Sequence, residues 1–260
     1  MITSVHNPKV QWVRRLQSKS KERRAEGAFV VEGVRLLEEG LNSGWQVNYI
    51  FYTDDLGERG MSIVKAFQAR DTKVEIVSEN VMRAISDTQH PQGILAVFEM
   101  HSIPLPERLN FILILDQIRE PGNLGTILRS AAVAGVQAVF LSPGTVDPFS
   151  PKVLRAGMGA HFTLPVHPAD WNEIESQIKH SKLHPYLASV DGGEVYHQAD
   201  FRHPLALIIG GEADGASDIA YKASDSLIHI PRYGEVESLN ASVAAGILLF
   251  EIARQREIIS

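Results

Sequence analysis

The sequence predicts an α/β protein in two parts, a small α/β sandwich domain followed by a larger domain built on a parallel β-sheet. Apolar segments of strand length alternate with helical segments along the chain, as in proteins that pack helices against sheets. Residues 111–116, FILILD, form a continuous apolar run typical of a strand buried on both faces. Residues 101–110, HSIPLPERLN, hold two prolines and no strong periodicity, which indicates a linker. The predicted domains are therefore residues 1–100 and 111–260.

Short alternating segments make up residues 1–100. Residues 10–16 and 34–44 have helical patterns, and the second helix is expected to end at Gly44. Strands are predicted for the segments FVVEG, VNYIFYT, VEIVS and GILAVFEM. This alternation over about 100 residues predicts the small α/β sandwich.

The alternation after the linker is more regular. Strands are predicted for FILILD, AVFLSP, PYLASV, LALIIGG and SLIHIP. Helices are predicted for NLGTILRSAAVAG, PKVLRAGMG and ADWNEIESQIKH, and from about Leu239 to Glu257. The result is a parallel sheet with helices on both sides, in which ligands bind beyond the carboxyl ends of the strands.

Two of these helices have features that the structure can test. Asn123 is a favourable N-cap residue for the helix that ends at Gly135. In the last helix, one face carries four apolar residues, Leu239, Val243, Ile247 and Phe250.

Composition limits the class of protein. The 260 residues are 44% hydrophobic and 22% charged, as in soluble globular proteins. No apolar run is long enough to span a bilayer, the N-terminus lacks an apolar signal core, and the chain has no cysteine. We therefore expect a cytoplasmic protein without disulfides. His180 and His184 have the spacing of a helical metal pair, but Pro185 follows and no third ligand is evident, so no metal site is expected.

Charge is unevenly distributed along the chain. Residues 1–24 hold seven Lys and Arg residues against Glu22 alone, a local balance of +6. Because the net charge of the whole chain is −6, the remainder carries −12. A basic arm on an acidic body can contact RNA phosphates, and the candidate residues are Arg14, Arg15, Arg23 and Arg24. A solvated helix face is the alternative interpretation.

Three loops that follow predicted strands carry the chemistry. In residues 116–126, a Pro-Gly turn leads to Asn123 and, six residues later, Arg129, which could face an anionic or hydroxyl substrate. In residues 210–217, Gly210 and Gly211 permit close approach of a ligand, and Glu212 follows. The pattern GxGxxG of dinucleotide sites is absent.

The third loop, residues 231–240, offers the hydroxyl of Ser238 and the amide of Asn240 at the start of the last helix. Ser238 could simply cap that helix. However, the first residues of the helix are small (ASVAAG), which lets a backbone or a flat ligand come close. Three loops of this kind suggest one composite pocket.

Together these loops resemble the SpoU (TrmH-type) ribose 2′-O-methyltransferases of the SPOUT superfamily. The resemblance rests on NLGTILR, GGEADG and IPRYGEVESLNASVAAGILLFE, in this order, across residues 111–257. The segments NPKVQWVRRL and GAFVVEGVRLLEEGL resemble the small RNA-binding domain that often precedes the SpoU domain. Arg232 stands where the family usually has Met, and Gly157 where relatives often have Ser.

The resemblance implies a deep trefoil knot in the larger domain and a bent S-adenosylmethionine held by the second and third loops. It implies cofactor contacts at the backbones of Gly210, Gly211, Ile230 and Leu239. Arg129 is implied to take or relay the proton of a ribose hydroxyl, although a guanidinium is a poor base in water. The residues implied to position the reactants are Asn123, Glu212, Ser238 and Asn240. The family also implies a homodimer with an active site built across the interface, and no metal.

The sequence therefore predicts an S-adenosylmethionine-dependent RNA 2′-O-methyltransferase, with rRNA favoured over tRNA by the long N-terminal domain. Arg155 in RAGMGA joins the candidate RNA contacts, with Arg119 and Arg232 as further candidates. One alternative is a catalytically inactive RNA-binding or ribosome-assembly factor on the same fold. A second is a nucleotide-dependent oxidoreductase on a doubly wound sheet.

Overall fold

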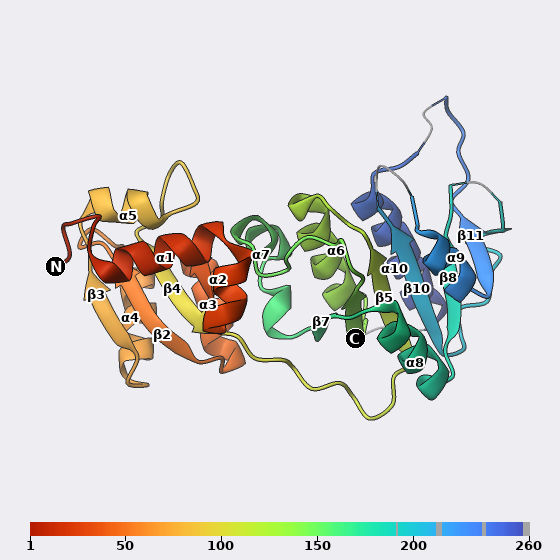
Figure 1. Ribbon diagram of the computed structural model, residues 1–260, viewed down its shortest axis with the longest axis horizontal. Coiled ribbons are helices and arrows are strands. Elements are labelled where there is room, and N and C mark those ends of the chain that lie inside the picture. Colours follow the sequence, from red (N-terminus) through yellow and green to blue (C-terminus); the bar gives the residue numbers. More distant parts are fainter. Residues whose placement is uncertain (191, 212–214, 236–237, 257–260) are drawn as a thin grey trace. The chain divides into compact units, whose positions relative to one another are not determined.

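The computed structural model describes residues 1–190, 192–211, 215–235 and 238–256, and its contacts divide the chain into two compact units (Figure 1). The N-terminal unit comprises Met1–His101 together with Phe149–Phe162. The C-terminal unit comprises Ser102–Pro148 and Thr163–Ser260. The division therefore differs from the predicted boundary at residues 149–162.

The N-terminal unit is built on a four-stranded sheet with the order β1-β4-β2-β3. Its strands are β1 (Ala28–Glu32), β2 (Val47–Tyr52), β3 (Lys73–Ile76) and β4 (Ile94–Glu99). β4 pairs antiparallel with β1 and β2, whereas β2 and β3 are parallel. All four strands were predicted from the apolar segments of the sequence.

Helices cover both faces of this sheet. They are α1 (Pro8–Ser18), α2 (Ser20–Glu26), α3 (Val34–Ser43), α4 (Glu58–Gln68) and α5 (Glu79–Ile85). α1 and α5 share one core with Val30, Phe51 and Val97 of the sheet. The alternate residues face the other side, where Phe98 contacts Phe67 of α4. α3 ends at Gly44, which adopts φ +77 as its C-cap, as predicted. The helices α2, α4 and α5 were not predicted.

Residues 149–162 complete the N-terminal unit with α7 (Pro151–Gly157) and the 3-10 helix η1 (Ala160–Phe162). The Phe149 ring lies 4.8 Å from that of Phe29 in β1. The Phe162 ring lies 5.2 Å from that of Phe98 and 5.5 Å from that of Trp45. This segment, which we call the strap, is therefore part of the aromatic core of the N-terminal unit.

A seven-stranded sheet with the order β7-β6-β5-β10-β8-β11-β9 forms the C-terminal unit. Every pair of neighbours is parallel, as predicted. The strands are β5 (Phe111–Asp116), β6 (Ala138–Leu141), β7 (Val166–Pro168), β8 (His184–Ala188), β9 (Glu194–Val195), β10 (Leu205–Gly210) and β11 (Ser226–His229). β7 and β9, which have three and two residues, were not predicted.

Helices lie on both faces of the parallel sheet, namely α6 (Pro121–Val133), α8 (Trp171–Ser181), α9 (Asp218–Ala223) and α10 (Ala241–Gln255). α8 and α9 share a core with one face, including Ile112, Ile114 and Ile208. α6 and α10 pack side by side, and α10 also contacts β10 (Figure 1). The α/β fold of the prediction is thus confirmed, while the knot stays a prediction. None of the described helices is long and apolar enough to cross a bilayer.

Two details of the helices differ from the prediction. α6 begins at Pro121 and is capped by Glu120, whose carboxylate accepts from the Gly122 N–H, so Asn123 lies inside its first turn. α10 begins at Ala241 rather than Leu239. Its face with Val243 and Phe250 is half exposed, because the opposite face, with Leu248, Leu249 and Ile252, packs on the unit.

Candidate active site

The first loop is anchored by Asp116, the last residue of β5. Its carboxylate is fully buried, and it accepts from Ser142 Oγ at 2.6 Å and from the Ser217 N–H at 2.7 Å. Ser142 Oγ also accepts from the Gln117 N–H at 3.1 Å. One side chain therefore joins the ends of β5, β6 and the 210–217 loop. The sequence analysis did not identify Asp116 as an anchor of these loops. A carboxylate at the end of an otherwise apolar strand is the pattern that could have indicated this role.

The two glycines of the second loop are required by packing within the protein. A Cβ on Gly210 would lie 2.4 Å from the Ala216 nitrogen, and one on Gly211 would lie 2.6 Å from the Gln117 carbonyl oxygen. A β-bridge between Gly211 and Gly215 closes the loop. That these glycines make room for a ligand stays a prediction, and the structure shows that they also let the loop fold back on itself.

The third loop leads into α10 through Asn240, which caps the helix in place of Ser238. Asn240 Oδ1 accepts from the Ser242 N–H at 2.9 Å and the Val243 N–H at 3.4 Å. Its Nδ2 donates to Asn123 Oδ1 at 3.0 Å. The predicted site residues Asn123 and Asn240 therefore hold the first turns of α6 and α10 together.

A cavity of about 530 Å³ lies at the carboxyl ends of β8, β10 and β11. It is lined by predicted residues from the second and third loops, namely Gly210, Gly211, Ile230, Ser238 and Leu239. Apolar side chains, among them Ile209, Ile228 and Leu248, form much of the remaining wall, and Ala241 and Ala244 of α10 border it. Ser189, Tyr221 and Arg232 add polar groups. Size and lining match those of small-molecule sites, and the place is where parallel sheets bind ligands.

Two predicted residues of this group, Arg129 and Glu212, remain. Arg129 is exposed on α6 and does not line the cavity as the described residues define it. Glu212 lies outside the described residues. Among the described residues, no group of three His, Cys, Asp or Glu side chains is placed to hold a metal ion.

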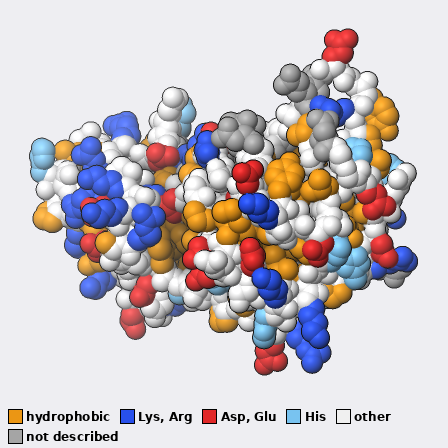
Figure 2. All heavy atoms as spheres, turned by 45° about the vertical axis from the view of Figure 1, so that its right-hand side comes forward, with side chains coloured by type: hydrophobic (Ala, Val, Ile, Leu, Met, Phe, Trp, Pro, Cys, Tyr) orange, Lys and Arg blue, Asp and Glu red, His pale blue; other side chains and the backbone are white. Residues whose placement is uncertain are grey.

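The predicted RNA-binding arginines fall into two groups. Arg14 and Arg24 are exposed on α1 and α2, and Figure 2 shows Lys and Arg side chains gathered on this unit. Arg15 is half exposed, with Glu22 Oε2 at 3.7 Å. Arg23 differs from the prediction, because it is only 3% exposed and its Nη1 donates to the Leu16 and Gln17 carbonyls. Arg23 therefore fixes the junction of α1 and α2 instead of facing solvent.

Arg155 lies on α7, within the N-terminal unit. Its Nη1 is 2.8 Å from Asp87 Oδ2, and about a third of its side chain is exposed. Asp87 belongs to a turn held by Glu32, whose carboxylate accepts from Ser86 Oγ at 2.6 Å and Thr88 Oγ1 at 2.9 Å. Arg155 thus ties the strap to this turn.

Comparison with known proteins agrees with this architecture. Residues 110–250 match the family model described as "SpoU rRNA Methylase family", and residues 7–96 match "MRM3-like substrate binding domain". The 23S rRNA (guanosine(2553)-2'-O)-methyltransferase RlmP of Bacillus subtilis is 33% identical over 251 residues, which cover 96% of this chain and 98% of that protein.

Two solved structures are similar over nearly the whole chain. The AdoMet-bound rRNA methyltransferase from Sinorhizobium meliloti has a TM-score of 0.89 and 31% identity, with coverage of 100% of this chain and 98% of that one. The SpoU methyltransferase AviRb from Streptomyces viridochromogenes, in complex with AdoMet, has a TM-score of 0.87 and 26% identity, with coverage of 97% and 100%. The chain belongs to the SpoU rRNA methylase family, as its three loops predicted.

Proposed function

We propose that this protein is an S-adenosylmethionine-dependent rRNA ribose 2′-O-methyltransferase. The observation that carries the proposal is the 530 Å³ cavity at the carboxyl ends of the parallel strands, walled by the second and third loops. The family and the AdoMet-bound relatives support the cofactor, and the relatives named as rRNA methyltransferases support the substrate.

The cavity fits the proposed cofactor. Its apolar wall suits a flat adenine ring and an aliphatic chain, while backbone groups at Gly210, Ile230 and Leu239 can provide hydrogen bonds. When bound, S-adenosylmethionine supplies a methyl group on a sulfonium, which is already a good leaving group. The protein must therefore orient the ribose 2′-oxygen and remove its proton.

Arg129 is the proposed group that takes or relays this proton. Arg129 is exposed on α6 and does not line the cavity of its own chain, so it is free to act at the cavity of a second copy. α6 and α10 also expose Val133 (70%), Val243 (50%) and Phe250 (50%), which a second copy could bury. We therefore propose a cytoplasmic homodimer in which Arg129 acts across the interface. Asn123 and Asn240 are proposed to position α6 and α10 relative to each other. Ser238 is proposed to position the third loop, and Glu212 the substrate.

Cofactor binding is tested by thermal unfolding with S-adenosylmethionine and, separately, with NAD. A ligand that binds the folded state raises the midpoint in a concentration-dependent way. S-adenosylmethionine should raise it and NAD should not, whereas the opposite result would favour an oxidoreductase. Gly210→Leu should abolish the shift because its side chain collides with Ala216, while Gly57→Ala, which has open space, should keep it.

Catalysis across the interface is tested by mixing two inactive variants. Arg129→Ala should lower kcat by about 100-fold or more with little change in cofactor affinity. Mixed dimers of Arg129→Ala and Gly210→Leu chains should regain activity, since one cavity is intact and faces an intact arginine. Mixtures that stay inactive although dimers form would show that Arg129 does not act across the interface. Arg129→Ala with near-normal turnover would show that Arg129 does not take or relay the proton.

A further inference from the structure

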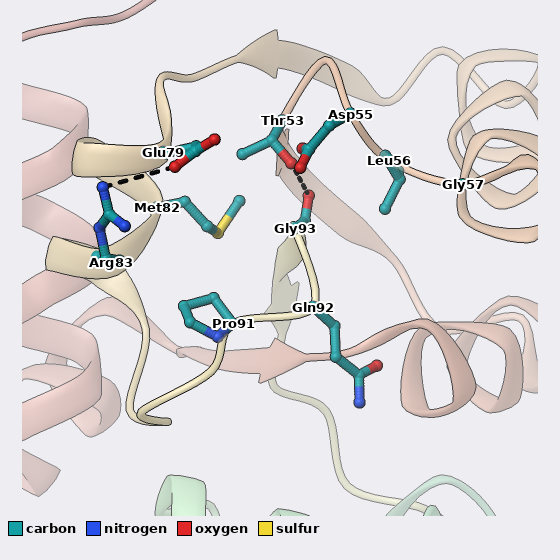
Figure 3. A pocket seen from close by; sticks show the side chains of 10 residues that line it. All are labelled: Thr53, Asp55, Leu56, Gly57, Glu79, Met82, Arg83, Pro91, Gln92 and Gly93. Atoms are coloured by element: carbon teal, nitrogen blue, oxygen red, sulfur yellow. Dashed lines mark hydrogen bonds and ion pairs between the residues drawn. The ribbon is translucent and has the colours of Figure 1, made fainter.

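A second cavity, of about 360 Å³, lies within the N-terminal unit (Figure 3). Its walls come from the loop that follows β2, from α5, and from residues 91–93 before β4. Its volume lies within the range of small-molecule sites. No residue of the proposed methyl-transfer machinery lines it among the residues that the structure describes.

The floor of this cavity is held in place by hydrogen bonds within the protein. The Thr53 N–H donates to the Gly93 carbonyl at 2.9 Å, and the Thr53 hydroxyl donates to the same oxygen at 3.4 Å. Gly93 has φ +73, and a Cβ there would lie 2.5 Å from Thr53 Oγ1. Gln92 Oε1 accepts from the Val34 N–H at 3.1 Å, which fixes the other end of this segment. The cavity is therefore built before any ligand arrives.

Its lining combines apolar walls with carboxylates. Figure 3 shows the Met82 side chain between Thr53 and Pro91, with Leu56 on the side opposite α5. Asp55 and Glu79 contribute two carboxylates, whereas Arg83 contributes one guanidinium, 3.6 Å from Glu79 Oε2. This balance disfavours a phosphate and favours a flat neutral group that donates hydrogen bonds.

The cavity is also close to the basic helices. One face of α5, with Val81 and Ile85, packs against α1, and Ile85 O accepts from Gln17 Nε2 at 2.9 Å. The opposite face, with Glu79 and Arg83, lines the cavity, together with Met82, which is buried and also belongs to the core shared with α1. Arg14 is exposed on α1, which packs against the α5 helix that lines the cavity.

We propose that this cavity binds an unstacked guanine of the substrate RNA while α1 and α2 contact the phosphates. The Watson–Crick edge of guanine carries two adjacent N–H donors that a carboxylate can accept together, and Asp55 is the proposed acceptor. The apolar side chains of Leu56, Met82 and Pro91 hold the ring, as proteins do with the splayed bases of single-stranded RNA. This inference rests on the proposed RNA substrate and assigns a specificity site outside the methyl-transfer centre.

Binding is tested on the full chain by the NMR signals of its five ¹³C-labelled methionine methyl groups. The Met82 signal is assigned with Met82→Leu, and Met158 in the strap serves as internal control. Guanosine should shift Met82 and leave Met158 unchanged, and Asp55→Asn should abolish this shift. No shift of Met82, an equal shift by adenosine or uridine, or a shift by inorganic phosphate would overturn the proposal.

Use of the site is tested by methyl transfer to rRNA fragments. Asp55→Asn should raise KM for RNA about tenfold, as expected for one lost bidentate base contact, with unchanged kcat and cofactor affinity. The neighbouring carboxylate Asp54 is exposed and does not line the cavity, so Asp54→Asn should behave as wild type. Equal KM values for the two variants would overturn the proposal.

The two measurements separate this inference from the proposed function. Guanosine binding at Met82 in a protein that transfers no methyl group would support the site and contradict the enzyme. Methyl transfer without guanosine binding would do the reverse.

Discussion

Asp116 holds three segments at the edge of the cofactor cavity with one buried carboxylate. Asp116→Asn would place an amide N–H₂ against either Ser142 Oγ or the Ser217 N–H, both of which now donate to it. We expect the free energy of unfolding to fall by about 3 kcal/mol, because a buried donor loses its acceptor. The affinity for S-adenosylmethionine should fall as well, since Ser217 ends the loop that borders the cavity. Urea unfolding and calorimetric titration measure the two effects.

Asp218 provides the matched control, because it directly follows Ser217 and is exposed in the first turn of α9. Asp218→Asn should change neither quantity appreciably. If Asp116→Asn were equally silent, the carboxylate would not anchor the loop.

His167 and His203 make stability depend on pH. Burial lowers the pKa of both imidazoles below the ordinary 6.5, and His184 lowers that of His203 further. As the pH falls below 6.5, these two histidines take up protons in the unfolded chain before they do so in the folded chain. The free energy of unfolding is therefore highest above pH 6.5 and falls as the pH drops below that value. Unfolding at pH 7.5 and 5.5 should show this loss, and His167→Gln should reduce it.

At the scale of elements, α1 and α2 should divide their arginines between RNA and the fold. Glutamine at Arg14 and Arg24 should lower the salt dependence of RNA binding, by about 1 in slope for each lost phosphate contact. Arg23→Gln should instead reduce stability, by about 2 kcal/mol, because it leaves the carbonyls at the end of α1 without this donor. Filter binding at several salt concentrations and urea unfolding distinguish these outcomes. An unchanged slope in the Arg14 and Arg24 variant would show that α1 and α2 present a solvated face.

α10 is apolar on both sides, and only one side packs within the chain. Phe250→Glu should therefore yield a monomer, as measured by sedimentation. This monomer should lack methyltransferase activity, as measured by methyl transfer to RNA. Ile219 on α9 is similarly exposed, at 47% against 50% for Phe250, and Ile219→Glu should leave the dimer intact. A dimeric Phe250→Glu protein would place the interface elsewhere.

The elements that the sequence predicted are those with strong local patterns. The apolar runs of β5, which ends at Asp116, and of β10 were recognisable without knowledge of their surroundings, and Gly44 marked the end of α3 correctly. The N-cap of α6 was misplaced by three residues, because Glu120, an uncommon cap, takes the place predicted for Asn123 and the helix begins at Pro121. The hydrogen bond between Asn123 and Asn240 joins residues 117 apart in sequence, so no local pattern could predict it.

The difference between local sequence patterns and contacts between distant segments also explains which features of the site could be predicted. Gly210 and Gly211 were found from their pattern, but their cause, contact with Ala216 and Gln117, depends on how the loop closes. The buried position of Arg23 likewise depends on how α2 turns back toward the end of α1. Residues 149–162 belong to the N-terminal unit because of aromatic contacts with distant segments, and the periodicity of the sequence does not encode such contacts.

For the whole molecule, the strap predicts the result of removing the N-terminal unit. A chain that lacks residues 1–100 would expose Phe149, Val153, Leu154 and Phe162, all of which are buried or partly buried in the intact protein. We expect this truncated chain to aggregate, as measured by light scattering. A second truncation with Phe149 and Phe162 changed to Ser should be more soluble. A monodisperse first truncation would show that the strap is stable without the unit it completes.

The strap also sets an order of events during synthesis on the ribosome. The surfaces of Phe29, Trp45 and Phe98 leave the exit tunnel well before Phe149 and Phe162, which must pack on them. At about 5–20 residues per second, the 61 residues from Ser102 to Phe162 take roughly 3–12 s to translate. For that interval the nascent N-terminal unit carries an open aromatic patch, and it becomes complete only when part of the next unit has been made. A gene segment that ends at the linker would therefore not encode a complete N-terminal unit, because residues 149–162, which finish its core, are encoded after the linker.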